Sequence, residues 1–127
     1  MDAFLDFFGL ERKRRGGQRV LIDWPVDIQV PGKDSYVAFL GRDLSTKGMS
    51  LDGPSIVWMD LGVSRDKDTR IRIRVPFKDF KIEAEVKLKW TLVEKDVTTT
   101  GWEFILPLKH EDQQFITEYI KEHIGKS

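Results

Sequence analysis

Apolar and polar residues alternate along several short stretches of the chain, and this period of two is typical of half-buried β-strands. The first example begins soon after residue 20. Its apolar positions are Ile22, Trp24, Val26, Ile28 and Val30, with Asp23, Pro25, Asp27 and Gln29 between them. Because proline cannot donate to a β-ladder, Pro25 predicts a sheet edge or a bulge.

Turn residues separate this strand from the next one. Pro-Gly-Lys-Asp at 31–34 is typical of a tight turn, and residues 36–40 predict the returning strand. A polar loop, Asp-Leu-Ser-Thr-Lys-Gly, is expected over 43–48. The stretch 53–68 has no clear pattern, and its segment 56–59 fits either a strand or a packed loop.

The second half of the chain alternates most clearly and predicts three more strands. Their apolar positions are Ile71, Ile73 and Val75 in one, then Phe80, Ile82, Ala84, Val86, Leu88, Trp90 and Leu92 in another, with a last strand over 98–104. Several short strands separated by turns are typical of an antiparallel sandwich or small barrel. The four tryptophans are expected in the core, since Trp24, Trp90 and Trp102 are in phase with apolar positions.

Both ends of the chain depart from the strand pattern. Near the C-terminus the apolar period becomes helical, with Glu111 and Asp112 in the first turn and Gly125 just past the end; the stripe is Phe115, Ile116, Tyr119, Ile120 and Ile124. Phe4, Leu5 and Phe8 in the N-terminal apolar segment 1–11 predict a short helix or arm. We therefore expect a mainly β domain over 12–127, closed by a C-terminal helix.

Composition removes several functional classes. The chain has no cysteine, which excludes disulfides and thiolate zinc sites, and both histidines, His110 and His123, are expected on the surface of the helical tail. The 21 basic and 21 acidic residues cancel, so no overall field favours DNA or anionic lipid. No segment is long enough to span a bilayer, and the first ten residues lack the leading positive charges of a secretory signal. We expect a cytoplasmic protein.

Catalytic motifs are also missing from the sequence. It contains no Gly-x-Ser-x-Gly elbow, P-loop, Gly-x-Gly-x-x-Gly or His-Glu-x-x-His. We therefore expect no enzymatic activity, no cofactor and no metal site.

Two polar segments carry the functional signal. Residues 11–19 hold five basic side chains around a Gly-Gly pair, with Arg15 and Arg19 four residues apart. In an antiparallel pair the start of the first strand and the end of the second lie at the same end of the sheet, so this segment should meet the loop 43–48. Arginine binds phosphate bidentately and also reaches the O6/N7 edge of guanine, whereas a carboxylate accepts from guanine N–H groups. The two segments together predict a site for a phosphate that carries a guanine.

The order of these motifs resembles the PilZ domain, a bacterial receptor domain for cyclic di-GMP. The matching residues are Arg15 and Arg19, then Asp43, Ser45 and Gly48, and later Gly101 and Phe104; the match runs from Arg12 to Ile124. The resemblance implies a six-stranded antiparallel β-barrel that binds cyclic di-GMP through Arg15, Arg19, Asp43, Ser45 and Gly48. It makes Arg14 a further candidate, which would influence whether one nucleotide or a stacked pair binds. Arg70 and Arg74 share the arginine spacing but are expected on the outward face of a strand.

The resulting hypothesis is a receptor that signals when ligand orders the Arg-x-x-x-Arg loop. The ordered loop would reposition the N-terminal segment and change a surface for a protein partner, as in motility or biofilm regulation. Two alternatives stay open: a small β-barrel that binds single-stranded nucleic acid, and a nucleotide-independent adaptor of motility or pilus machinery. At residue level, Asp43 and Ser45 could merely cap a turn, and Gly48 could be needed only for a positive φ.

Overall fold

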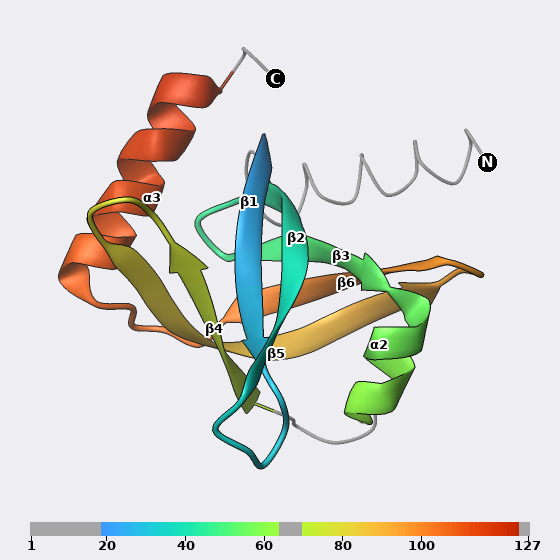
Figure 1. Cartoon of the computed structure of the whole chain (residues 1–127). Coiled ribbons are helices and arrows are strands. Elements are labelled where there is room, and N and C mark those ends of the chain that lie inside the picture. The colour runs from blue at the N-terminus through green and yellow to red at the C-terminus, as the bar shows by residue number, and fades with distance from the viewer. Residues whose placement is uncertain (1–18, 64–69, 125–127) are drawn as a thin grey trace.

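Six antiparallel strands form a closed barrel in the computed structural model, which describes residues 19–63 and 70–124 (Figure 1). The order around the barrel is β1-β2-β3-β6-β5-β4. The strands are β1 (Val20–Gln29), β2 (Tyr36–Leu44), β3 (Gly48–Pro54), β4 (Arg70–Pro76), β5 (Lys81–Val93) and β6 (Val97–Phe104), and the helices are α2 (Ser55–Leu61) and α3 (His110–His123). The mainly β, six-stranded barrel with a C-terminal helix that the sequence predicts is therefore confirmed.

The alternating apolar side chains fill the inside of this barrel. Val20 and Leu44, which face each other across β1 and β2, are both buried, as are the inward residues of the other strands; these include Val26, Ile28, Leu51, Ile73, Val75, Ile82 and Val86. Trp58 and Trp102 meet edge to face in the core, with their ring centroids 6.1 Å apart. Burial of this apolar surface supplies the main driving force for folding.

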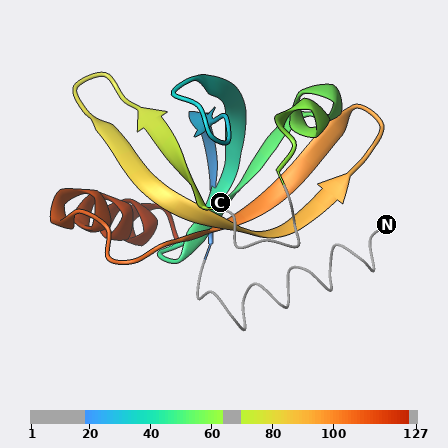
Figure 2. The same cartoon turned by 90° about the horizontal axis from the view of Figure 1, so that it is seen from below.

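Helix α3 packs against the barrel through an aromatic cluster around Trp24. The Trp24 ring lies 5.1 Å from Phe77 and 4.9 Å from Tyr119, and Ile116 and Ile120 of α3 are buried. Trp24 lies in the first half of β1, so α3 and its aromatic side chains pack beside that part of the strand. Helices α2 and α3 lie on opposite sides of the barrel (Figure 2).

Pro25 stands directly after an irregularity in β1, as its chemistry predicts. The register between β1 and β2 shifts between Leu21 and Trp24, and Pro25 then pairs with Leu40. The prediction of a bulge near this proline is therefore confirmed.

Two predictions need correction. The polar loop expected over 43–48 is shorter, because Leu44 pairs with Met49 and only residues 45–47 lie between the strands. Residues 56–59 belong to helix α2 rather than to a strand or a loop. Residues 56–59 are all apolar, so the sequence shows no helical period there, although Trp58 points into the core and Ile56 is 80% exposed. Among the described helices, none is long and apolar enough to cross a membrane.

Candidate functional site

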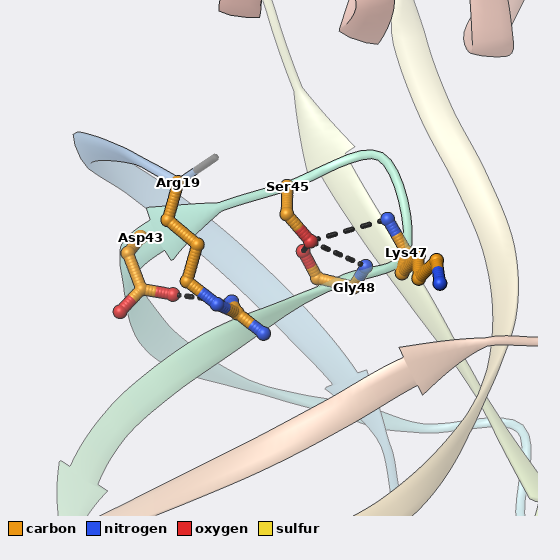
Figure 3. A network of polar contacts seen from close by, with 5 residues as sticks. All are labelled: Arg19, Asp43, Ser45, Lys47 and Gly48. Atoms are coloured by element: carbon orange, nitrogen blue, oxygen red, sulfur yellow. Dashed lines mark hydrogen bonds and ion pairs between the residues drawn. The ribbon is translucent and has the colours of Figure 1, made fainter. Parts of the chain in front are cut away.

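Arg19 and Asp43 come together at the end of the barrel where β1 begins and β2 ends. The pairing of Val20 with Leu44 fixes this arrangement, and Arg19 Nη1 donates to Asp43 Oδ1 at 2.8 Å (Figure 3). The Asp43 side chain is only 7% exposed. A charge-assisted hydrogen bond to a buried carboxylate is among the stronger polar contacts in proteins. The predicted convergence of the two polar segments is thus present for these two residues.

The turn after β2 is held by the side chain of Ser45. Its Oγ accepts hydrogen bonds from the backbone N–H groups of Lys47 (3.1 Å) and Gly48 (3.3 Å), and its own N–H donates to the Gly48 carbonyl (2.8 Å). Ser45 is fully buried. The N–H of Phe104 in β6 also donates to the Lys47 carbonyl at 2.8 Å. Ser45 therefore caps the turn, as the sequence allowed, and supports the strand end that carries Asp43.

Gly48 is required by the neighbouring strand. Its φ is not positive, since the positive-φ glycines in the described part of the chain are Gly32 and Gly62. A Cβ at Gly48 would instead overlap with the carbonyl oxygen of Trp102 in β6. The interpretation that Gly48 is needed only for a positive φ is wrong; a close approach between β3 and β6 requires it.

Five residues form one register row on the side of the sheet that faces away from the barrel interior, and three of them, Asp43, Ser50 and Gly101, are nevertheless buried. Leu21 pairs with Asp43, Asp43 with Ser50, Ser50 with Gly101, and Gly101 with Trp90. Paired residues of neighbouring strands point to the same face. This face is the outer one, because the next residues, Val20 and Leu44, are buried in the core whereas Leu21 is exposed. We call these five residues the outer row.

Trp90 belongs to the outer row although the sequence pattern placed it in the core. Leu88 and Trp90 are two residues apart and should share a face, but the β5–β6 register shifts between them. This irregularity turns Trp90 to the outside, where its indole lies over Gly101, so that a Cβ there would overlap with the ring. Trp58 and Trp102 are buried as predicted, whereas Trp24 and Trp90 are half-buried. No signal in the alternation reveals the bulge.

Irregular pairing surrounds the outer row. Besides the shift in β5, the β1–β2 register shifts after Leu21 and the β2–β3 register shifts between Gly41 and Asp43. Bulges bend strands and redirect side chains, and they are enriched next to functional sites. The outer row therefore lies on a part of the sheet that departs from regular geometry in three strands.

The remaining predicted site residues are distributed differently. Arg14 and Arg15 lie outside the described residues, as do Phe4, Leu5 and Phe8. Phe104 is buried in the core. Of the two arginines on β4 that share the Arg-x-x-x-Arg spacing, Arg70 is exposed, and Arg74 is half-buried with its guanidinium carbon 3.6 Å from the centre of the Tyr36 ring.

No family model and no curated protein matches the sequence. Several solved structures are similar in fold. The inhibitor of motility MotI/DgrA of Bacillus subtilis has 18% identity and a TM-score of 0.64 over 85% of this chain and 50% of its own. The PlzA protein of Borreliella burgdorferi, solved in complex with c-di-GMP, has 11% identity and a TM-score of 0.61 over 99% of this chain and 58% of its own.

A third similar structure is the PilZ domain of CeSA from a cellulose synthesizing bacterium. Its identity is 11% and its TM-score 0.60, over 83% of this chain and 96% of that domain. This chain thus spans about half the length of the first two proteins and nearly all of the isolated domain.

Proposed function

Because the chain has the fold of a PilZ domain, we propose that it is a non-catalytic receptor for cyclic di-GMP. The observation that carries the proposal is the Arg19–Asp43 pair, which joins a cation and a carboxylate at one end of the outer row. The likeness to PlzA, a protein solved with c-di-GMP, supports the same class of ligand.

The two side chains of this pair offer complementary chemistry to the ligand. The Arg19 guanidinium can donate to a phosphate or to the O6/N7 edge of guanine. The Asp43 carboxylate can accept from the N–H groups on the opposite edge of a guanine. Ligand would therefore replace or extend the Arg19–Asp43 bond with contacts of the same kind.

Trp90 would complete the site by stacking. Its indole lies on the outer face over Gly101, in the same register row as Asp43. A base that stacks on an aromatic side chain gains about 1–3 kcal/mol. In this proposal Arg14 and Arg15 add cations from the N-terminal side, and Ser45 and Gly48 keep the β2–β3 turn in place.

Signalling would follow from the position of the arginine segment. Arg19 is bonded to the barrel through Asp43, and Arg15 precedes it by four residues. Ligand held by both arginines would order residues 12–18, and the N-terminal apolar segment 1–11 would follow. A protein partner that recognises this changed face would receive the signal.

Titration calorimetry with cyclic di-GMP tests the proposal. We expect Arg19→Ala to weaken binding by about ten- to a hundredfold, since a hydrogen bond to a charged group contributes roughly 1.5–3 kcal/mol. Arg70→Ala is the matched control, because Arg70 lies on β4, outside the outer row, and its loss should leave affinity unchanged.

Two results would overturn the assignment. One is equal loss of affinity in both arginine variants, which would indicate diffuse electrostatic attraction. The other is wild-type protein that gives no heat with cyclic di-GMP but binds a short single-stranded oligonucleotide with a steep salt dependence.

A further inference from the structure

A second pair of opposite charges lies beside the outer row. Arg42 Nε is 3.6 Å from Asp52 Oδ2, and the side chains are 57% and 24% exposed. Neither residue belongs to the Arg-x-x-x-Arg or Asp-x-Ser-x-x-Gly motif. The pair therefore adds a carboxylate and a guanidinium that the motifs do not explain.

The β2–β3 bulge explains why this pair faces the same side as Asp43. Gly41 pairs with Leu51 and Asp43 with Ser50, so Arg42 is the extra residue of β2. Leu51 points into the core, and Asp52, the next residue, therefore points outward. The salt bridge shows that the exposed Arg42 side chain also lies on the outer face, next to Asp43 in the chain.

Within the described residues, one oxygen of the Asp52 carboxylate has no hydrogen-bond partner. Oδ2 faces Arg42, but Oδ1 is buried and has no hydrogen-bond partner in the described part of the chain. An unsatisfied buried acceptor is unfavourable, and such groups are uncommon in folded proteins. A ligand that donates hydrogen bonds would relieve it, and the more exposed Arg42 side chain can move to admit one.

The two carboxylates, Asp43 and Asp52, lie close enough for one ligand to contact both. Asp43 pairs with Ser50, and Asp52 lies two residues further along β3. Side chains in this diagonal relation are about 7–8 Å apart. Thr99, the partner of Asp52 on β6, lies two residues before Gly101, the partner of Trp90.

We propose that Arg42 and Asp52 recognise the second base of the cyclic dinucleotide and select guanine over adenine. This inference rests on the proposed function and extends its site. Asp52 would accept from the N1–H and N2–H groups of guanine, whereas adenine has an acceptor at N1 and no amino group at C2. Arg42 would donate to O6 and N7. The pair would thus read the second guanine with the same chemistry that Arg19 and Asp43 offer the first.

Calorimetry with cyclic di-GMP and with the mixed ligand cyclic GMP-AMP separates the two base sites. Wild-type protein should bind the mixed ligand about tenfold or more weakly, because one good bidentate pair gives that much discrimination. In Asp52→Asn the affinity for cyclic di-GMP should fall and the difference between the ligands should largely vanish. Glu85→Gln is the control, because Glu85 is an exposed residue of β5 that lies opposite Arg72 of β4 in the strand register. This variant should keep the wild-type affinity and discrimination.

Each outcome decides a different question. If wild-type protein binds cyclic di-GMP and Asp52→Asn keeps both the affinity and the discrimination, the Arg42–Asp52 assignment is wrong while the receptor function stands. If Asp52→Asn weakens both ligands equally, the pair does not read the base. If wild-type protein binds neither ligand, the proposed function fails. Arg42→Gln is the second variant, and it should also reduce discrimination, with thermal unfolding as the check on folding.

Discussion

Gly48 and Gly101 are required by close contacts between neighbouring strands, and the two contacts differ in kind. Gly48 faces the backbone carbonyl of Trp102, which cannot move without shifting β6. Gly101 faces the side chain of Trp90, which can move. Removing the Trp90 ring should therefore relieve the overlap caused by alanine at Gly101 but not the overlap caused by alanine at Gly48.

We expect Gly48→Ala and Gly101→Ala each to lower the free energy of unfolding by about 1–3 kcal/mol, the usual cost of overpacking. In a Trp90→Ala background the cost of Gly101→Ala should fall, because the obstructing ring is gone, whereas the cost of Gly48→Ala should stay the same. Urea unfolding of the single and double variants measures both effects. Equal costs for Gly101→Ala in the two backgrounds would contradict the contact with Trp90.

Residue-level prediction succeeds where a local motif meets simple topology. Asp43 and Arg19 could be brought together from sequence, because antiparallel pairing places a strand start beside the neighbouring strand end. The outward positions of Trp90 and of the Arg42–Asp52 pair could not be predicted from the sequence, because each depends on a bulge. A single extra residue changes the face of every side chain after it, and periodicity alone does not reveal it.

At the scale of elements, the contact between α3 and β5 contains a buried carboxyl group. Asp112 lies in the first turn of α3, and its Oδ2 has no hydrogen-bond partner in the ranges that the structure describes. Burial raises the pKa of Asp112, although a backbone hydrogen bond at Glu83 and the charge of Lys109 partly oppose this. On β5, the hydrogen bond from Lys81 lowers the pKa of Glu83.

These two carboxyl groups should affect stability with opposite pH dependence. Because the pKa of Asp112 is raised, the folded state holds that proton more tightly, and the contribution of Asp112 to stability falls as pH rises from about 3.8 through the folded pKa. The lowered pKa of Glu83 gives a contribution that is present above its ordinary pKa of 4.5 and is lost as pH falls.

Asp112→Asn should therefore gain stability relative to wild type as pH rises from 3.8 through the folded pKa of Asp112. Glu83→Gln should change in the other direction, because its loss of stability is full above pH 4.5 and shrinks as pH falls below that value. Thermal unfolding of both variants from below pH 3.8 to neutral pH is the measurement. A difference between Asp112→Asn and wild type that is the same at every pH would show that Asp112 titrates normally.

Element types follow the sequence pattern except where apolar residues point both ways. The strong alternation of β1, β4 and β5 and the helical stripe of α3 predict these elements directly. Helix α2 is only seven residues long, and its exposed Ile56 and Met59 mask the inward position of the buried Trp58. A run so short carries less than two helical turns of pattern, so its packing decides the structure.

At the scale of the whole molecule, the proposed signal concerns the segment that precedes β1. Hydrogen exchange of the amides from Phe4 to Arg19 should slow when cyclic di-GMP saturates the protein, because ligand held by Arg15 and Arg19 orders the chain between them. The amides of β5 distant from the outer row serve as the internal reference. Exchange from Phe4 to Arg19 that is equally protected, or equally fast, with and without ligand would refute this means of signalling and leave the binding proposal intact.

The pairing between β3 and β6 affects when the site can form during synthesis of the protein. Ser50 and Gly101 are neighbours in the barrel, although β4 and β5 separate their strands in the sequence. Pairing between strands that are distant in the sequence is slow to form, because the entropy cost of closing the long loop between them comes before the stabilising contacts are made. A ribosome that has released β1, β2 and β3 has already supplied Arg19 and Asp43, but Trp90 and Gly101 are still missing. The complete site that we propose would therefore form only after β6 has been synthesised.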